Sequence, residues 1–516
     1  MKPASIFNHV IGPVMRGPSS SHTAGAFHIG ALARSLLGGD PSSAAVAFDA
    51  DGSYAKCYRE QGADLAFAAG LMGWSITDER FLDALKAAAD AHLKIEFAVR
   101  RLAEADHPNA VDIELSSAQG RRLHARANSV GGGAIEFVRL GGWPVHFTGD
   151  AHEIAVAVER GAEAGVLDLL GRDGALLGPP DRQSRAGESL VSVRRRRPLP
   201  PEARDRLAAL REVREVWIAK PVFFVQAGEP TFASAKEMAA LARDRGLSLG
   251  SVALEYESTL LGLSQGEVLA ETRRRLDIMR RAVASGLAAA PPVMQLLAPS
   301  AGRIYAAEAA GRLAVGGLHT RAAARALAVM HVNGGMGVVC AAPTAGSAGV
   351  LPAVLVTLAE EKNLEEERAA LALLAAGAVG VVVANRATFA AEVAGCQVEI
   401  GAAGAMAAAA VVEAAGGTAE QAADAAAIAF QNTMGSVCDL VQGIVEIPCH
   451  TRNAAAASNA FLCADMILGG YANPVPLDET LDAVYAVGKM LPPELRCTAL
   501  GGLAAAPSAR ALKRLR

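Results

Sequence analysis

Runs of alternating apolar and polar residues in the first 150 positions predict β-strands, and runs with helical spacing predict helices between them. Strands are expected over residues 45–48, 111–115, 122–127 and 134–140, and helices over residues 22–37 and 63–71. Glycine-containing turns separate the last three strands, which predicts an antiparallel meander. Residues 1–150 are therefore expected to form an α+β domain.

Residues 151–222 repeat this mixture on a smaller scale. The pattern predicts strands over residues 153–158, 189–193 and 216–218, helices over 164–170 and 201–211, and an irregular loop over 172–185. The order is that of a ferredoxin-like module in which the loop takes the place of one strand. A regulatory small-molecule site, a spacer and a dimer contact all fit such a module.

From about residue 223 onward the apolar positions follow helical spacing and alanine is frequent. Capping boxes are expected at Ser234 with Glu237, Ser264 with Glu267 and Thr418 with Gln421, and helix ends at Gly246, Gly286, Gly311 and Gly416 with Gly417. Residues 223–516 therefore predict an all-α domain. The fold class of the whole chain is expected to be α+β.

Composition sharpens this prediction. Hydrophobic residues make up 52% of the chain but aromatic residues only 4%, so alanine, leucine and valine must build the core. The net charge of −4 gives no electrostatic reason to expect nucleic acid or an anionic membrane as partner. The longest apolar run, residues 369–384, is shorter than the roughly 20 residues of a membrane span and predicts a buried core helix.

The seven cysteines show no regular pairing, and residues 1–12 lack the pattern of a signal peptide. Both features favour reduced thiols in the cytoplasm. Three of the cysteines, Cys396, Cys438 and Cys449, lie 42 and 11 residues apart, and helical pattern separates the first two. Three thiolates without a close fourth suit an iron–sulfur cluster that leaves one iron for a substrate, whereas closed zinc sites draw on tight cysteine pairs. Three buried, inert thiols fit the spacing equally well.

A second candidate site is the hydroxyl-rich stretch before the first predicted helix. Ser19, Ser20, Ser21, His22 and Thr23 are consecutive. Hydroxyls and unpaired backbone N–H groups at a helix start suit a carboxylate, and four hydroxyl residues and a histidine in five positions exceed what N-capping requires. We therefore expect a substrate-carboxylate site here, with His22 as general base or acid.

Four motifs carry a resemblance to a known family. The sequences GCQVEIGAAGAM, CDL with GIVEIPCHTRNAAAASNA, and APTAGSAGVLPAVL resemble the catalytic half of the iron–sulfur-dependent L-serine dehydratases, and GPSSSHTAG resembles their other half. The resemblance implies a lyase that converts L-serine to pyruvate and ammonia. It also implies a [4Fe-4S] cluster on Cys396, Cys438 and Cys449, and an ACT-like identity for residues 151–222.

Further site residues follow from these motifs. By resemblance, Thr344 and Gly346 of APTAGSAG line the active site, and the family places a catalytic histidine at His22. Arg452 and Asn453, just after Cys449, are candidates for a clamp on the substrate carboxylate. We expect a small-molecule substrate and a homodimer.

One departure from the family pattern concerns the substrate. Gln61 stands where relatives carry a second catalytic histidine, and glutamine cannot act as a base near neutral pH. Either His22 alone or a nearby Tyr54, Lys56 or Tyr58 handles the proton, or the protein acts on a different small β-hydroxy acid or has altered activity.

A second departure is at the C-terminal end, where some relatives carry a cysteine that reaches the active site. Here Cys497 lies about twenty residues before the end. Two roles are possible for it: it caps the open iron of the cluster, or it packs in the protein interior. Two other protein classes remain as alternatives, a non-catalytic iron–sulfur sensor and a zinc protein.

Overall fold

The computed structural model describes residues 3–288 and 293–515. Internal contacts divide the chain into two units. One contains Ser21–Ala227 and is called the α+β unit here. The other, the helical unit, contains the N-terminal segment up to Ser20 together with Gly228–Arg516. The predicted α+β class is confirmed, because the strands concentrate in the first unit and the long helices in the second.

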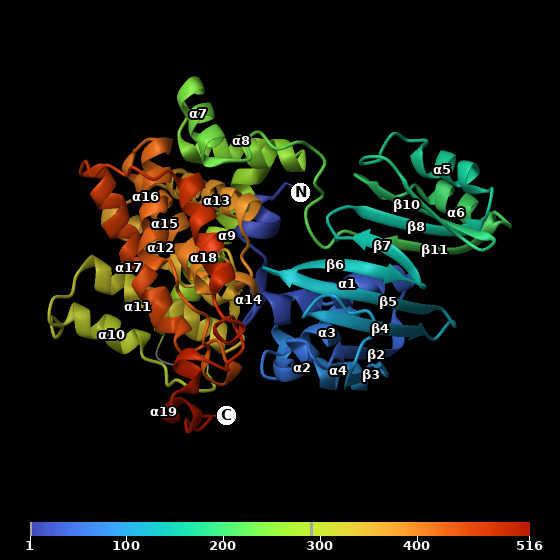
Figure 1. Cartoon of the computed structure of the whole chain (residues 1–516), viewed down its shortest axis with the longest axis horizontal. Helices are drawn as coiled ribbons and strands as arrows, with labels where there is room; N and C mark the ends of the chain where they lie inside the picture. The colour runs from blue at the N-terminus through green and yellow to red at the C-terminus, as the bar shows by residue number, and fades with distance from the viewer. Residues whose placement is uncertain (1–2, 289–292, 516) are drawn as a thin grey trace. The chain divides into compact units, whose positions relative to one another are not determined.

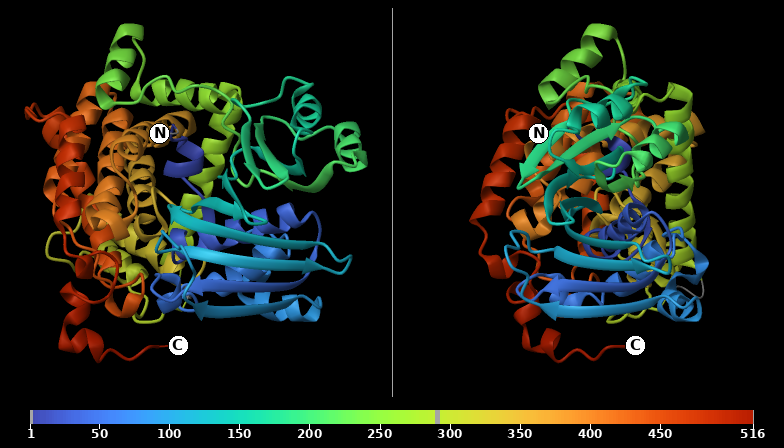
Figure 2. Two further views of the ribbon diagram at one scale, coloured as in Figure 1. Left: turned by 45° about the vertical axis from the view of Figure 1, so that its right-hand side comes forward. Right: turned by 90° about the vertical axis from the view of Figure 1, so that its right-hand side faces the viewer.

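A six-stranded sheet forms the first layer of the α+β unit. Its strands lie in the order β3-β2-β4-β5-β6-β7, with bounds Lys94–Arg100, Pro41–Asp49, Ala110–Ser117, Arg122–Gly131, Ala134–Leu140 and Trp143–Phe147. Within this sheet β2 and β3 pair in parallel and the other neighbours pair antiparallel, so the predicted antiparallel meander β4-β5-β6 is confirmed. Figure 2 shows these strands running side by side.

Four of the described α-helices accompany this sheet: α1 Gly25–Leu37, α2 Tyr54–Cys57, α3 Ala63–Leu71 and α4 Ala84–Asp90. Helix α1 packs on β4, β5 and β6 and also against α3 (Figure 1). The predicted helix at residues 22–37 begins later as an α-helix, because a π-helical turn occupies Ser20–Ala24. That turn carries most of the hydroxyl-rich stretch.

A second sheet in the same unit has the strand order β11-β8-β10-β9, antiparallel throughout, with helices α5 Glu163–Gly171 and α6 Pro201–Ala209. Its strands are β8 His152–Glu159, β9 Asp181–Arg185, β10 Glu188–Arg195 and β11 Val213–Ala219. This is the strand order of a ferredoxin-like module. The prediction of an irregular loop over residues 172–185 was wrong for β9. The residues of this edge strand are polar and mostly exposed, so they show no alternation of apolar and polar positions.

The helical unit contains thirteen α-helices among its described residues. They are α7 Ala235–Arg245, α8 Leu249–Leu261, α9 Gln265–Leu287, α10 Ala301–Ala309, α11 Leu318–Gly334, α12 Val350–Lys362, α13 Glu366–Arg386, α14 Ala391–Ala394, α15 Ile400–Ala415, α16 Ala419–Thr433, α17 Cys449–Leu468, α18 Leu477–Met490 and α19 Pro507–Arg510. The capping boxes predicted at Ser264 and Thr418 are both formed. Helix α15 packs against α12, α13, α16 and α17, and its alanines and glycines permit this crowding.

Two segments, Glu366–Arg386 and Cys396–Ala415, are long and apolar enough to cross a membrane by length and composition alone. In each, 78% of the apolar window is buried inside the protein. The predicted core helix over residues 369–384 is thereby confirmed as part of α13.

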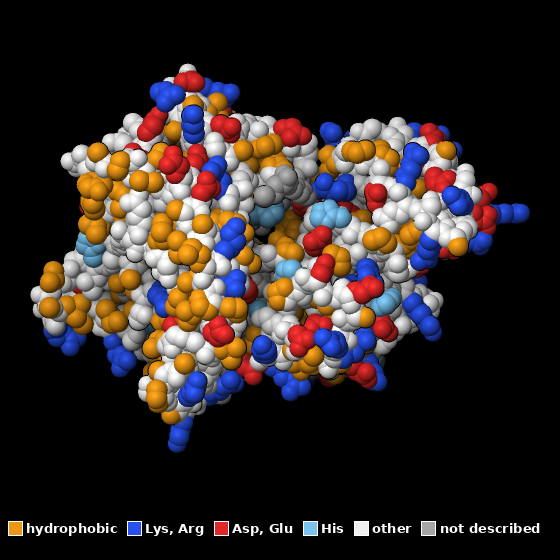
Figure 3. All heavy atoms as spheres, in the orientation of Figure 1, with side chains coloured by type: hydrophobic (Ala, Val, Ile, Leu, Met, Phe, Trp, Pro, Cys, Tyr) orange, Lys and Arg blue, Asp and Glu red, His pale blue; other side chains and the backbone are white. Residues whose placement is uncertain are grey.

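On the face drawn in Figure 3, acidic and basic side chains are interspersed.

The helix end predicted at Gly286 was wrong, because α9 continues to Leu287. This glycine serves close packing instead: a Cβ atom there would overlap the carbonyl oxygen of Ala328 on α11. We expect Gly286→Ala to cost about 1–3 kcal/mol of stability through overpacking, read as a lower midpoint of thermal unfolding. Gly266→Ala on the same helix is the control, because a Cβ there lies 4.0 Å from its nearest neighbour, Oγ of Ser264. Equal midpoints for the two variants would contradict this explanation.

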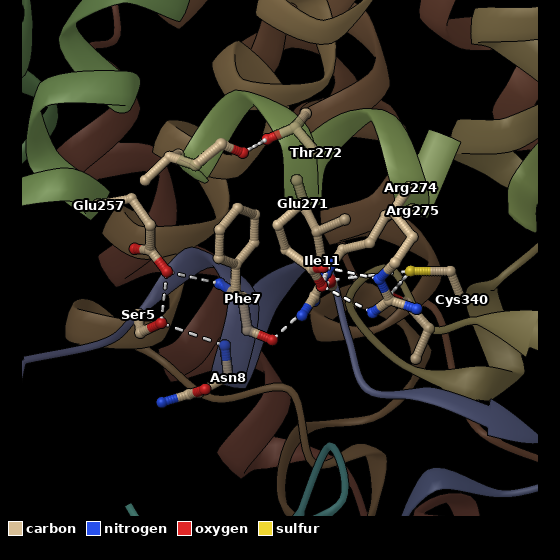
Figure 4. A network of polar contacts seen from close by, with 12 residues as sticks. Ser5, Phe7, Asn8, Ile11, Glu257, Glu271, Thr272, Arg274, Arg275 and Cys340 are labelled. Atoms are coloured by element: carbon tan, nitrogen blue, oxygen red, sulfur yellow. Dashed lines mark hydrogen bonds and ion pairs between the residues drawn. The ribbon is translucent and has the colours of Figure 1, made fainter. Parts of the chain in front are cut away.

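Within the helical unit, the N-terminal segment is bound to helices α8 and α9 by two buried residues, Glu257 and Arg275 (Figure 4). The Glu257 carboxylate accepts hydrogen bonds from Oγ of Ser5 at 2.6 Å and from the N–H groups of Ile6 and Phe7, both at 2.8 Å. The Arg275 guanidinium donates to the carbonyls of Phe7, at 2.7 Å, and Ile11. These contacts satisfy backbone groups that water cannot reach.

The segment then continues as β1, Val14–Arg16, which pairs antiparallel with β12, Val338–Cys340. Beyond β1, the N–H of Gly17 donates to the carbonyl of Gly337 at 3.1 Å, and Nδ2 of Asn333 donates to the carbonyl of Pro18 at 3.1 Å. The backbone that leads into the hydroxyl-rich stretch is therefore fixed on α11 and β12.

Candidate active site

The three predicted cluster cysteines come from three separate segments of the helical unit. Cys396 opens the 3₁₀ turn Cys396–Val398 between α14 and α15, Cys438 lies in the loop after α16, and Cys449 is the first residue of α17. All three are buried and none forms a disulfide. The sulfur atoms of Cys396 and Cys438 and a carboxylate oxygen of Glu399 lie within 4.8 Å of one another. The Cys449 thiol interacts electrostatically with Cys396 and Glu399.

Burial and the neighbouring thiols govern the protonation of two of these cysteines. The hydrogen bond with Cys396, the hydrogen bond with Cys497 and then burial raise the pKa of Cys438 well above its ordinary value. Burial, followed by the charge of Cys396, does the same to the pKa of Cys449. Such thiols stay protonated without metal, and a bound metal releases their protons. Soft sulfur donors gathered in a buried place fit an iron–sulfur cluster.

Glu399 is a member of this group that the sequence analysis missed. Oγ1 of Thr344 donates a hydrogen bond to its carboxylate, and burial raises the pKa of Glu399 to about 7. A Cβ on Gly346 would lie 2.5 Å from Oε1 of Glu399, so a larger residue there would displace this carboxylate. The signal for Glu399 was its place three residues after Cys396, a spacing that brings two donors to one side of a helical turn.

Arg452 lies between the thiols and an acidic partner. Its guanidinium forms an ion pair with the Asp439 carboxylate, with the nearest nitrogen and oxygen 2.9 Å apart, and it donates to the carbonyl of Val437 at 2.7 Å and to Sγ of Cys396 at 3.8 Å. Its positive charge therefore acts directly on a predicted cluster ligand. Its predicted contact with a substrate carboxylate stays a prediction.

Asn453 connects helix α17 to the APTAGSAG loop. Its Nδ2 donates to the carbonyls of Gly346 and Cys449, each at 2.8 Å, and its Oδ1 accepts from the N–H of Gly349 at 3.0 Å. The buried amide thus positions a cysteine and a glycine of two predicted site motifs. A direct substrate contact of Asn453 also stays a prediction.

The C-terminal segment lies beside Cys438 and Asp439. The N–H of Cys438 donates to the carbonyl of Leu495, and the N–H of Cys497 to the carbonyl of Cys438, each at 2.8 Å. The two thiols are hydrogen-bonded. The Asp439 carboxylate accepts the N–H of Leu503 at 2.8 Å. The Cys497 thiol thus lies beside a predicted ligand, and its two interpretations, capping of the open iron and packing, both stay predictions.

The hydroxyl-rich stretch is divided between the two units. Ser19 and Ser20 belong to the helical unit, and Ser21, His22 and Thr23 belong to the α+β unit. His22 is buried, and burial lowers its pKa to about 4. Its Nε2 and Oγ of Ser53 are hydrogen-bonded at 2.9 Å. The imidazole is therefore neutral near pH 7.

The region around Gln61 meets this stretch inside the α+β unit. Oγ1 of Thr23 donates to the carbonyl of Gln61 at 2.7 Å, and the Tyr54 hydroxyl donates to the carbonyl of Ser21 at 2.9 Å. The Tyr54 proton is thus committed to a backbone carbonyl. Lys56 is exposed. Of the groups named for proton transfer, His22 is the one buried beside a hydroxyl partner.

Comparisons with known proteins decide the family. A family model described as the serine dehydratase alpha chain matches residues 244–504. The chain belongs to the serine dehydratase family. Family membership makes it a lyase, as the motifs predict.

Individual relatives of the serine dehydratase family cover both halves of the resemblance. A probable L-serine dehydratase alpha chain of Bacillus subtilis is 40% identical over 283 residues, which are 55% of this chain and 94% of the relative. The L-serine dehydratase alpha chain of Peptoniphilus asaccharolyticus is 36% identical over 282 residues, 54% of this chain and 97% of the relative. A probable L-serine dehydratase beta chain of B. subtilis is 40% identical over 174 residues, 33% of this chain and 77% of the relative. This serine dehydratase therefore joins both chain types in one polypeptide.

Proposed function

We propose that the chain converts L-serine to pyruvate and ammonia by β-elimination of water, with a [4Fe-4S] cluster held by Cys396, Cys438 and Cys449. The observation that carries the proposal is the gathering of buried, reduced thiols from three segments beside Glu399 and Arg452. Relatives in the same family are named L-serine dehydratases.

The chemistry divides among the cluster and the protein groups. When bound, the cluster supplies a Lewis-acidic iron with an open position for the leaving hydroxyl. Arg452 offsets negative charge at the thiolate of Cys396, and Asn453 keeps the APTAGSAG loop on helix α17. Ser19, Ser20, Ser21 and Thr23 form the turn for the substrate carboxylate, in which the Thr23 hydroxyl donates to the carbonyl of Gln61.

His22 is the proposed acceptor of the proton from Cα of serine. A general base must be unprotonated at the working pH, and a pKa of about 4 leaves the imidazole neutral near pH 7. Gln61 does not titrate and cannot accept this proton, so His22 is the proposed base. The aminoacrylate that forms after loss of water tautomerises and hydrolyses to pyruvate and ammonia without the enzyme.

Three further features belong to this proposal. The proposed domains are residues 1–150, 151–222 and 223–516, with an ACT-like middle module, although residues 1–20 pack with the helical unit. It works in the cytoplasm, and it forms a homodimer. Size measurement in solution tests the dimer, and binding of small amino acids to the intact protein tests the ACT-like module.

The test of function is an anaerobic purification followed by a pyruvate assay with L-serine, and by the matching oxo-acid assays with L-threonine and other small β-hydroxy acids. Turnover of L-serine at rates well above the others is the expected result. A brown protein that is inert toward all of them would favour the sensor, and a colourless zinc protein would exclude the cluster. Gln61→His, assayed beside the wild type, tests whether this position sets substrate choice, because an unchanged preference would remove it from the account.

A further inference from the structure

The imidazole of His22 is held by two consecutive residues of one segment. Its Nε2 is hydrogen-bonded to Oγ of Ser53 at 2.9 Å. The Tyr54 ring meets the imidazole edge to face, with centroids 4.8 Å apart and an angle of 65° between the planes. The Tyr54 hydroxyl also donates to the carbonyl of Ser21, next to His22. One segment therefore fixes both the ring and the turn that carries it.

Ser53 is itself placed firmly by its surroundings. Its N–H donates to the carbonyl of Pro108 at 2.8 Å, and its carbonyl accepts from Sγ of Cys57 at 3.3 Å. The neighbouring Tyr54 ring stacks on Phe48 with centroids 5.0 Å apart. The backbone of Ser53 is thus held by the fold of the α+β unit, and its hydroxyl is directed by the contact with His22.

We infer that Ser53 is a positioning residue for proton transfer by His22, an inference that rests on the proposed function. A histidine acts well as a base only when its ring orientation is fixed, and a hydrogen-bond partner on one ring nitrogen fixes that orientation. The Ser53 hydroxyl provides that partner. A serine in a loop gives no sequence signal of its own, so only the contact with His22 reveals this role.

The test compares Ser53→Ala with Ser53→Thr and with Ser129→Ala. Ser129 is the matched control, because its buried Oγ donates to the carbonyl of Ser21 at 2.7 Å and therefore supports the same turn without touching the ring. For Ser53→Ala we expect kcat for L-serine to fall about 10-fold to 100-fold, the usual effect of losing an orienting partner, with KM changed less than about threefold.

A second readout separates positioning from general damage. If Ser53 orients the base, Ser53→Ala slows proton removal, so the kinetic isotope effect with Cα-deuterated L-serine increases. A merely misfolded fraction lowers kcat without altering that isotope effect. Ser53→Thr keeps the hydroxyl and is expected to restore most of kcat, and Ser129→Ala is expected to keep both kcat and the isotope effect.

The inference is overturned if Ser53→Ala matches Ser129→Ala in kcat and isotope effect. If Ser53→Ala does not fold, Ser53→Thr and Ser53→Cys give the same comparison, because only threonine retains a hydroxyl. A wild-type protein without serine turnover overturns the proposed function instead, so the two failures are distinguishable.

Discussion

Replacing Cys449 by serine is expected to remove the visible absorbance of the cluster and to lower kcat for L-serine by about 10³-fold or more. A Lewis-acidic metal contributes several kcal/mol to stabilising a leaving group, and each 1.36 kcal/mol corresponds to a factor of about ten. Loss of one of three thiol ligands removes that contribution. Visible absorbance, iron content and pyruvate release, all measured under anaerobic conditions, check the result.

Cys463→Ser is the matched control for this variant. Cys463 lies on the same helix, α17, and is equally buried, but its sulfur accepts a hydrogen bond from Nδ2 of Asn432 at 3.6 Å. We expect this variant to keep the cluster and kcat, because serine also accepts from that amide. If both variants lose the cluster alike, the loss reflects general damage to α17, and Cys449 is not a specific ligand.

Replacing His22 by glutamine is expected to lower kcat about 10²-fold to 10⁴-fold, the usual contribution of a general base, while the cluster absorbance stays. Glutamine keeps a hydrogen-bonding group near Ser53 but cannot accept the proton. The combination of a bound cluster and lost turnover identifies a role in proton transfer. Pyruvate release and iron content measured on the same sample check both halves of the result.

His28→Gln controls for the removal of a buried histidine from the same part of the chain. His28 lies on α1, is buried, and its Nδ1 contacts the carbonyl of Gly133 at 2.8 Å. Burial lowers its pKa to about 4, as it does for His22. The glutamine amide can donate to that carbonyl, so we expect near-normal kcat. A loss of kcat equal to that of His22→Gln would count against a special role of His22.

Much of the fold follows from local sequence pattern. The meander β4-β5-β6, helix α3 and the boxes at Ser264 and Thr418 are predictable because alternation, helical spacing and capping residues are local properties. The predictions at Gly286 and β9 were wrong for tertiary reasons. The glycine allows close approach to a carbonyl on another helix, and the strand is an exposed edge without an apolar face.

The candidate site is predictable only as far as its residues carry chemical signals. Cysteine spacing and the hydroxyl-rich turn are such signals, and they indicate the three thiols and His22 from the sequence alone. Asp439 and Ser53 act through contacts that no local pattern marks, and the only local signal for Glu399 is its spacing of three residues from Cys396. The approach of Cys497 to Cys438 likewise depends on how the C-terminal segment returns across the helical unit.

The most direct test of the account is the iron and acid-labile sulfide content of the anaerobically purified wild-type protein, measured with its absorbance spectrum before and after L-serine is added. The account predicts about four irons and four sulfides per chain, as a [4Fe-4S] cluster requires, and a spectral change when serine binds the open iron. A protein that contains zinc or no metal, yet releases pyruvate from L-serine, would contradict it.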